Sequence, residues 1–387
     1  MSESNKKFNN IIDKYIDDII SCSTPKEPLW NMEKILEGSV PRWNYIDACM
    51  IIGLINLYKH TGQKRFLEFA DQFYDYYIFD DGTILEYKTE SYNLDNICGG
   101  RVLFDLYEYT KKDKYKKAIE ILYADLLRQP RTESGNFWHK LIYPNQIWLD
   151  GLYMAQVFYT RYETLINNCQ NYDDIISQLK NVREFMFDPQ KRLYYHGFDY
   201  SHEAFWADSR GLSKSFWLRS IGWFLMSLVD IFEYMSDTHE KEKDTVKQIF
   251  IEAVDGVLQY IDPKFKMFYQ VVDCIGCQGN YLETSGSAMV AYAVLKGARL
   301  KILSQDYIIT GIEIFEGICK KYLKSERGKI KLGGICLMAG LGPKENLKRD
   351  GSYEYYISEP VVQNDAKGLG PFLMSYGEIK YLENNKY

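Results

Sequence analysis

The sequence has few of the features that mark a disulfide scaffold, a membrane protein or a disordered chain. Its 387 residues include only eight scattered cysteines and ten prolines, too few for a disulfide framework or a low-complexity chain of this length. No apolar run approaches the roughly 18 to 20 residues that a membrane helix needs. The opening stretch MSESNKKFNNIIDKYIDDII mixes charges through its apolar positions, unlike a secretory signal. We therefore expect a globular protein of the reducing cytoplasm that does not bind membranes.

Several chemical signatures are also missing. The sequence has no HExxH, no P-loop, no GxSxG and no GxGxxG with an acidic partner, the usual motifs of metal, nucleotide, acyl-transfer and hydride chemistry. Its one CxxC, Cys274 to Cys277, lacks the second ligand pair of a zinc site, and we interpret it as unpaired thiols. The net charge of −6 argues against nucleic acid, whose phosphates require clustered Lys and Arg. The sequence thus predicts no metal, no cofactor and no nucleic-acid partner.

Aromatic side chains, by contrast, are abundant. They make up 16% of the chain, with 33 tyrosines and seven tryptophans. Their flat apolar faces and polar tips suit walls that stack on sugar rings, although an aromatic-rich helical core would need the same residues. A hydrophobic share of 46% and the lack of any flexible linker predict one domain spanning residues 1–387.

Helical periodicity dominates the chain, and strand-like alternation is rare. The apolar spacing predicts twelve helices, at 5–22, 44–60, 63–79, 92–110, 113–129, 145–165, 172–187, 215–236, 243–262, 281–300, 305–324 and 364–381.

A weak internal repeat groups these helices into pairs. LYKHTGQKRFLEFA, which begins at Leu57, is matched 49 residues later by LYEYTKKDKYKKAI from Leu106. Both copies describe a helix that ends in Leu-Tyr, a short turn with Thr, and a second helix. Repeated hairpins form either an open solenoid or a closed ring. Polar and aromatic clusters recur at the start of alternate helices, which favours a ring with one pocket at one end.

Two aspartates are the candidate acids. Asp150 lies in NQIWLDGLYMAQ between aromatic and aliphatic residues, where burial would raise its pKa and keep it protonated for general-acid work. An N-cap or a carboxylate hydrogen-bonded within the helix is the alternative. Asp95, in SYNLDNICGG, equally suits a helix cap. If the ring closes, both acids come from successive inner helices and converge, and one could raise the pKa of the other.

Three further clusters supply groups that would suit a sugar acid. FWHK contains His139 and Lys140, and LYYHGFD contains His196. In SFWLRSIGWF, an arginine between tryptophans could hold a carboxylate bidentately while the rings stack on the sugar; these residues are Trp217, Arg219 and Trp223. Satisfied core histidines and ordinary core tryptophans remain alternatives.

The order of these motifs resembles glycoside hydrolase family 105, the unsaturated rhamnogalacturonyl hydrolases, which are related to the family 88 glucuronyl hydrolases. The similarity runs from WNYIDAC through NLDNICGG, FWHK, QIWLDGLYM, YYHGFD and WLRSIGW to LETSGSAMVAYA and GPFLMSYGE. Resemblance implies an all-α fold, an (α/α)6 barrel. It also implies that Asp150 is the catalytic acid, Asp95 the second active-site acid, and that substrate contacts fall on Tyr45, His139, Lys140, His196, Trp217, Arg219 and Trp223. The chain departs from the family's Gly-Asn-Gly-Trp run at Ser220 and Ile221.

The resemblance further implies an enzyme that needs no metal or nicotinamide. Its substrate is an oligosaccharide that carries a 4,5-unsaturated uronic acid, with hydration of the C4=C5 bond in pectin-derived galacturonyl-rhamnose as the leading hypothesis. The alternatives are an unsaturated glucuronyl hydrolase for glycosaminoglycan or ulvan fragments, and a non-catalytic oligosaccharide-binding helical protein.

Overall fold

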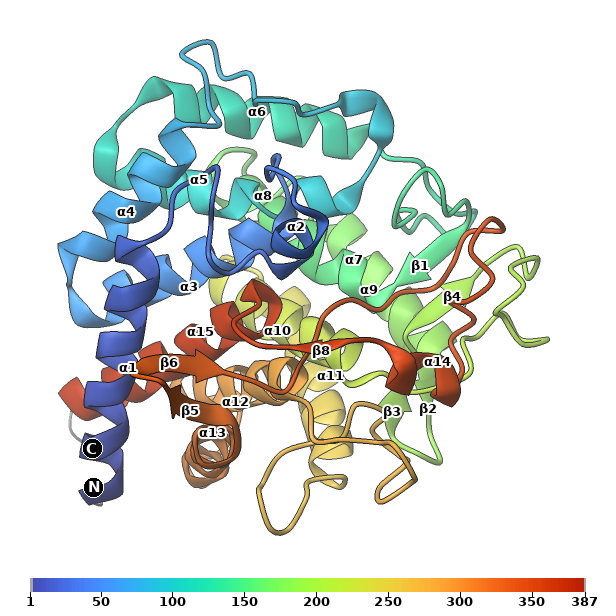
Figure 1. Cartoon of the computed structure of the whole chain (residues 1–387). Coiled ribbons are helices and arrows are strands. Elements are labelled where there is room, and N and C mark those ends of the chain that lie inside the picture. Colours follow the sequence, from blue (N-terminus) through green and yellow to red (C-terminus); the bar gives the residue numbers. More distant parts are fainter. Residues whose placement is uncertain (1–2, 386–387) are drawn as a thin grey trace.

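Six helices form an inner ring in the computed structural model, which describes residues 3–385 and the side chains of residues 8–385 (Figure 1). The ring comprises α3 (Tyr45–Thr61), α5 (Gly100–Thr110), the continuous run of α7 (Leu149–Gly151), η3 (Leu152–Gln156) and α8 (Val157–Leu165), then α10 (Leu218–Tyr234), α12 (Thr284–Arg299) and α15 (Ala366–Asn384). Each inner helix packs on the next, and α15 lies along α3. The ring is therefore closed, which confirms the predicted (α/α)6 barrel over the open solenoid.

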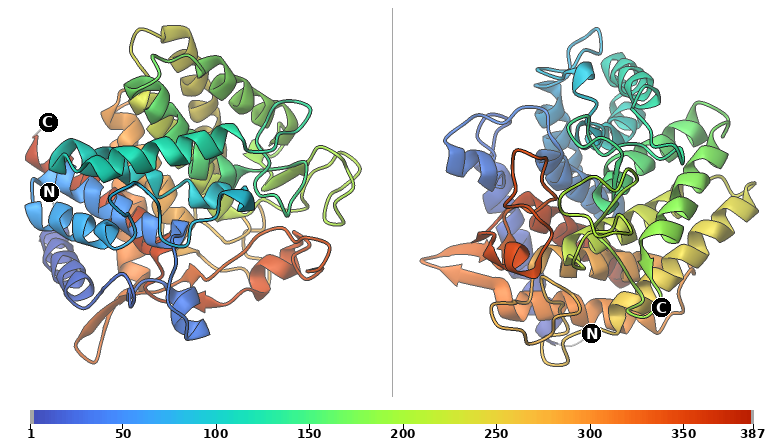
Figure 2. Two further views of the ribbon diagram at one scale, coloured as in Figure 1. Left: turned by 90° about the horizontal axis from the view of Figure 1, so that it is seen from above. Right: turned by 90° about the vertical axis from the view of Figure 1, so that its right-hand side faces the viewer.

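Six outer helices cover the ring. They are α1 (Glu3–Ser21), α4 (Lys64–Asp75), α6 (Asp113–Leu127), α9 (Tyr172–Met186), α11 (Glu240–Leu258) and α13 (Tyr307–Tyr322). In α4 the buried residues Phe66, Ala70, Phe73 and Tyr74 line one face, as expected for an amphipathic surface helix. In α12, by contrast, every residue from Thr284 to Ala298 is buried. The right-hand view of Figure 2 shows these helices arranged around one axis.

The internal repeat corresponds to two equivalent helical hairpins. The hydroxyl of Thr61 donates to the carbonyl of Leu57, and that of Thr110 donates to Leu106, both at 2.6 Å. The next residue in each copy ends its helix in the left-handed conformation. Each threonine hydroxyl then accepts from an amide of the connecting turn. The same local chemistry therefore ends α3 and α5, which confirms the predicted hairpin.

Two inner helices begin later than the sequence predicts. The segment 92–110 is helical only from Gly100, after the 3-10 turns η1 (Thr89–Ser91) and η2 (Leu94–Asn96). The segment 145–165 opens with strand β1 (Gln146–Trp148) and becomes helical at Leu149. Both differences arise because the preceding backbone pairs with other loops: residue 93 bridges residue 140, and β1 pairs with β4 (Gly197–Asp199).

The remaining elements are short. They are α2 (Met32–Glu37), β2 (Phe187–Asp188), β3 (Leu193–Tyr194), β5 (Leu323–Glu326), β6 (Lys329–Leu332), β7 (Ile335–Cys336), α14 (Tyr353–Ser358) and β8 (Val361–Val362). Four antiparallel pairs result: β1 with β4, β2 with β3, β5 with β6 and β7 with β8. In Figure 1, β1, β4 and α14 gather at one side of the molecule. Within residues 3–385, no helix is long and apolar enough to traverse a lipid bilayer.

Candidate functional site

Two three-residue strands bring Asp150 and His196 together at one end of the ring. Antiparallel pairing of β1 with β4 sets Trp148 opposite Gly197, and the amide of Leu149 donates to the carbonyl of His196 at 3.1 Å. Asp150 follows β1 and His196 precedes β4, so their side chains meet. His196 Nε2 lies 3.1 Å from Asp150 Oδ2, although neither atom has a well-aligned hydrogen bond. The Asp150 side chain is 14% exposed, although its Oδ2 is buried.

The backbone after Asp150 is unusual. Residues Leu152–Gln156 form a π-helical segment inside the inner helix, a distortion that is frequent at functional sites because it redirects neighbouring side chains. Gly151 leaves little room for a side chain, since a Cβ there would lie 3.1 Å from both His139 Nδ1 and Leu94 Cδ1 and would require them to shift slightly. This glycine therefore lets the histidine approach the helix that carries Asp150.

Asp95 is brought to its partners by a second backbone bridge. Residue Asn93 bridges Lys140, and the amide of Leu94 donates to the carbonyl of His139. Lys140 Nζ lies 2.6 Å from Asp95 Oδ2, and His139 Nε2 lies 3.5 Å from Oδ1. The cap of the η2 turn is the Asn93 side chain, which accepts from the Asp95 amide at 3.0 Å. Asp95 is therefore an ion-pair partner rather than the helix cap.

The expectation that burial raises the Asp150 pKa and keeps the acid protonated is wrong. Burial does act to raise this pKa, but the neighbouring imidazole of His196 and, more weakly, that of His139 outweigh it, and the pKa lies below its ordinary value. The free protein thus favours the Asp150 carboxylate.

Two side chains near Asp150, His139 and Tyr356, each have a single protonation state near neutral pH. Burial lowers the pKa of His139 to about 4, against the opposing effect of Asp95, so His139 is neutral near pH 7. Burial raises the pKa of Tyr356 far above its ordinary value, so its phenol keeps its proton. The Tyr356 hydroxyl lies 2.6 Å from His196 Nδ1. If the phenol donates there, the imidazole proton lies on Nε2, facing Asp150.

Arg219 is fixed before any ligand arrives. Its Nε donates to Ser285 Oγ at 2.7 Å, and one terminal nitrogen, Nη2, donates to the Cys336 carbonyl. Glu283 Oε1 lies 3.7 Å from the same nitrogen. Only Nη1 has no hydrogen bond to the described part of the chain, so the guanidinium offers one nitrogen rather than the predicted bidentate fork.

The predicted aromatic residues occupy different places. Trp217 stacks on Tyr356 at 5.7 Å between ring centroids and approaches His196 at 4.8 Å, so it lies at the acid site. Trp223 is buried within the ring and stacks on Tyr153 at 4.4 Å. Tyr45 begins α3; burial raises its pKa well above the ordinary value, and the negative charges of Glu33 and Asp95 add to the effect.

Sequence reasoning missed three residues of this end of the barrel. Tyr356 contacts His196, while Ser285 and Glu283 hold Arg219. The Ser285 hydroxyl in turn donates to Glu283 Oε1 at 2.7 Å. Tyr356 lies in a run of ordinary tyrosines with no diagnostic spacing. The other two fall in LETSGS, a motif that carried the family resemblance but to which no role was given.

The sequence of the chain matches a known protein family. The family model described as Glycosyl Hydrolase Family 88 matches residues 15–382, which is nearly the whole barrel. The chain belongs to this family. The hydrolase is thereby an enzyme of the unsaturated uronyl glycoside hydrolase class, as predicted, and the non-catalytic alternative is set aside.

Individual relatives place the hydrolase nearer to family 105. A solved family 105 glycoside hydrolase from C. acetobutylicum is 39% identical with a TM-score of 0.84, and the match covers 89% of this chain and 96% of that one. The unsaturated rhamnogalacturonyl hydrolase YesR of Bacillus subtilis is 22% identical over 271 residues, or 67% of this chain and 72% of YesR. An unsaturated glucuronyl hydrolase from Bacillus sp. GL1 shares the fold, at 14% identity and a TM-score of 0.60, over 89% of this chain and 87% of that one. The predicted resemblance to family 105 is confirmed.

Proposed function

We propose that this hydrolase hydrates the C4=C5 bond of a 4,5-unsaturated galacturonic acid at the non-reducing end of rhamnogalacturonan lyase products, and so releases that sugar from rhamnose. The observation that carries the proposal is the pairing of Asp150 with His196 at the end of the ring where the inner helix of Asp150 begins. Similarity to the B. subtilis rhamnogalacturonyl hydrolase supports the galacturonyl-rhamnose linkage. Under this proposal residues 1–387 act as one catalytic domain, in the cytoplasm.

The proposed reaction begins at a vinyl ether. Protonation of C4 by Asp150 places positive charge at C5, where the ring oxygen shares it. The Asp150 carboxylate then takes a proton from water as that water adds at C5, so the acid is regenerated. The hydrated sugar opens to a C5 ketone, and the hemiacetal left at C1 expels the neighbouring sugar. One carboxyl group thus serves as donor and then as base, and one water is consumed.

His196 has a positioning role in this proposal. It faces Oδ2 of Asp150 and so leaves Oδ1 to carry the proton toward the sugar. Tyr356 orients the imidazole from its other side. The substrate itself brings a negative carboxylate, and a like charge near Asp150 favours the protonated acid. Substrate binding therefore offsets the low pKa of Asp150 in the free enzyme.

Cations of the same region are proposed to receive the uronate. Arg219 keeps Nη1 for the carboxylate, and Lys140 adds a second positive charge. Asp95 is proposed as the second active-site acid, which holds Lys140 at 2.6 Å and presents its remaining oxygen to sugar hydroxyls. Trp217, together with Tyr45, His139 and Trp223, is proposed to form or support the wall against which the sugar lies.

We expect kcat/KM to fall as the pH rises. This ratio reports the ionisation of the free enzyme, in which the Asp150 pKa is lowered while the acid must be protonated to react. The protonated fraction, and with it kcat/KM, should fall about tenfold per pH unit above the pKa. His139, with a pKa of about 4, does not titrate between pH 5 and 8. Initial rates across that range provide the measurement, and a ratio that rises with pH would contradict the assignment.

A direct comparison of substrates tests the preference for the linkage and the neighbouring sugar, because the C4=C5 bond removes the stereocentre at C4 that distinguishes galacturonic from glucuronic acid. Purified protein is given unsaturated galacturonyl-rhamnose and an unsaturated glucuronyl disaccharide from a glycosaminoglycan, and the loss of ultraviolet absorbance of the double bond is followed. We expect kcat/KM to favour the galacturonyl substrate by at least about tenfold, corresponding to ~1.4 kcal/mol of transition-state discrimination. A preference for the glucuronyl disaccharide would replace the proposed substrate with that of the alternative.

A further inference from the structure

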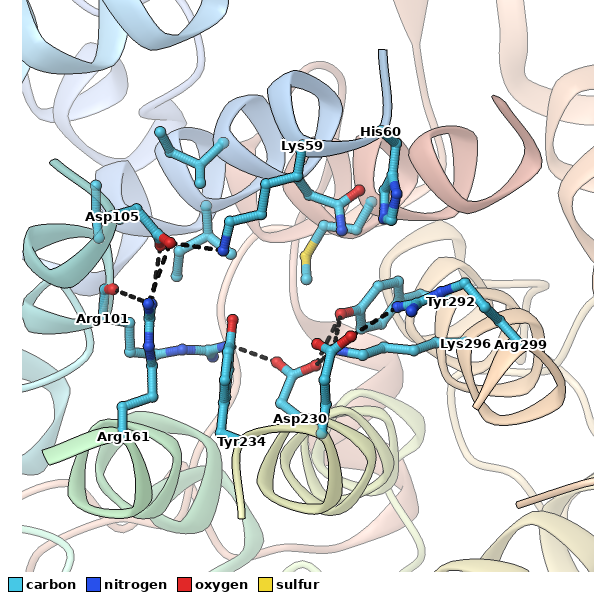
Figure 3. A pocket seen from close by; sticks show the side chains of 16 residues that line it. Lys59, His60, Arg101, Asp105, Arg161, Asp230, Tyr234, Tyr292, Lys296 and Arg299 are labelled. Atoms are coloured by element: carbon cyan, nitrogen blue, oxygen red, sulfur yellow. Dashed lines mark hydrogen bonds and ion pairs between the residues drawn. The ribbon is translucent and has the colours of Figure 1, made fainter. Parts of the chain in front are cut away.

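The end of the barrel opposite Asp150 contains a second, strongly charged cavity. Asp150 lies in the first turn of its inner helix, whereas Lys59, Tyr234 and Lys296 lie in the last turns of α3, α10 and α12. These residues and neighbours from α5 and α8 surround a cavity of about 70 Å³, room for more than one water molecule. Figure 3 shows charged side chains from several inner helices directed toward this space. Nothing in the proposed reaction uses it.

The cavity and its immediate border contain more cations than acids. The cations are Lys59, Arg101, Arg161, Lys296 and Arg299, and the acids are Asp105, Asp230, Glu233 and Glu378. Each acid is shared: Asp105 pairs with Lys59 and Arg161, and Asp230 with Arg101 and Lys296. Arg299 pairs with the other two, Glu233 and Glu378. Lys296 also pairs with Glu233, and His60 approaches Glu378. The cluster thus has one more positive than negative side chain. Burying such a net charge costs free energy unless an anion compensates it.

Helix ends account for only part of this excess. The carbonyl ends of inner helices carry partial negative charge and favour nearby cations. They do not explain an orphaned donor, however. Arg101 is only 4% exposed, and its Nη1 has no hydrogen-bond partner in the described part of the chain. The Tyr234 hydroxyl, which lines the same cavity, has no hydrogen bond there either. A buried donor such as Arg101 Nη1 is normally satisfied, whereas the Tyr234 hydroxyl is only partly buried.

We propose that the cavity binds a small oxyanion, a carboxylate or a phosphate, between Lys59, Arg101 and Tyr234. The anion would supply the missing negative charge and accept from Arg101 Nη1 and from the Tyr234 hydroxyl. Because those three residues come from α3, α5 and α10, the anion would join three inner helices at the end of the barrel far from the acid. This proposal does not depend on the proposed substrate.

Thermal unfolding of the full chain, titrated with inorganic phosphate and separately with acetate, tests the site. Ionic strength is balanced with chloride. Wild type should show a saturable rise in Tm of about 2–4 °C near saturation, since a ligand that binds only the folded state stabilises it. Lys59→Met and Tyr234→Phe should each weaken the apparent affinity at least tenfold. Lys116→Met, at an exposed position on α6, is the matched control and should behave as wild type.

The outcomes separate the possibilities. A saturable rise in Tm with phosphate alone would indicate a site for a tetrahedral anion. A saturable rise with both phosphate and acetate would indicate a site that also accepts a carboxylate. A rise that is linear, does not saturate and is equal in all four proteins would overturn the proposal, because it reports salt exclusion from the whole surface. Saturable binding unchanged by Lys59→Met and Tyr234→Phe would equally reject this cavity. Since each protein is compared with and without the probe, a variant of lower stability still gives a decisive result.

Discussion

Asp150→Asn is expected to lower kcat by about 10²–10⁴-fold, the usual contribution of a general acid. The amide cannot donate a proton to C4, and no second carboxyl is within hydrogen-bonding distance of His196 among the described contacts. KM should change much less, because Arg219, Lys140 and Trp217 are untouched. Initial rates from the loss of double-bond absorbance give both constants.

The fold of that variant should be retained. Asn has nearly the shape of Asp, and Asp150 Oδ2 has no well-aligned hydrogen bond to lose. Asp237→Asn, the same chemical change at a side chain that is 96% exposed, controls for the loss of one carboxylate and should keep the wild-type kcat. Turnover by Asp150→Asn at the wild-type rate would show that another group is the acid.

Asp230→Asn is expected to cause the largest loss of stability. Asp230 accepts from Lys296 at 2.6 Å and from Tyr292 at 2.7 Å, and it also pairs with Arg101. It is 1% exposed, and burial is outweighed by Lys296 and Arg101, which lower its pKa. Removing one partner of a buried ion pair costs roughly 3–5 kcal/mol because the remaining charges stay buried. Urea unfolding, with refolding verified, measures the change.

The matched control for this second variant is again Asp237→Asn. Asp237 pairs with Lys243 at 2.6 Å but lies at the surface, so its unfolding midpoint should stay at the wild-type value. Asp230→Asn that unfolds at the same urea concentration as this control would contradict the view that the buried charges hold α5, α10 and α12 together.

Local patterns in the sequence predict the helices well, but they do not predict how the helices meet. Apolar spacing identifies all twelve barrel helices, since each needs only a local repeat of 3.6 residues. The starts at 92 and 145 are wrong because they depend on bridges to residues distant in sequence, Lys140 and the β4 strand. Such two- and three-residue pairings carry no periodicity that a sequence can reveal.

In the candidate site, too, local sequence predicts which residues stand out but not which distant residues they contact. Asp150 stands out because a carboxyl among apolar residues is unusual, yet its pairing with His196 depends on the short β1 and β4 strands. The predicted direction of its pKa is wrong for that reason: burial can be predicted from neighbouring residue types, whereas the histidine partner cannot. Trp223 resembles a sugar platform by residue type, but its place against Tyr153 is set by tertiary packing.

The central claim, protonation of C4 by Asp150, is tested most directly by running the reaction in D2O and locating the deuterium by NMR in the first turnovers. The account predicts one deuterium at C4 of the released sugar, on a single face, formed at a rate that collapses in Asp150→Asn. Release of the neighbouring sugar with the C4=C5 bond intact and no deuterium at C4 would contradict it, because the acid would then protonate the glycosidic oxygen instead.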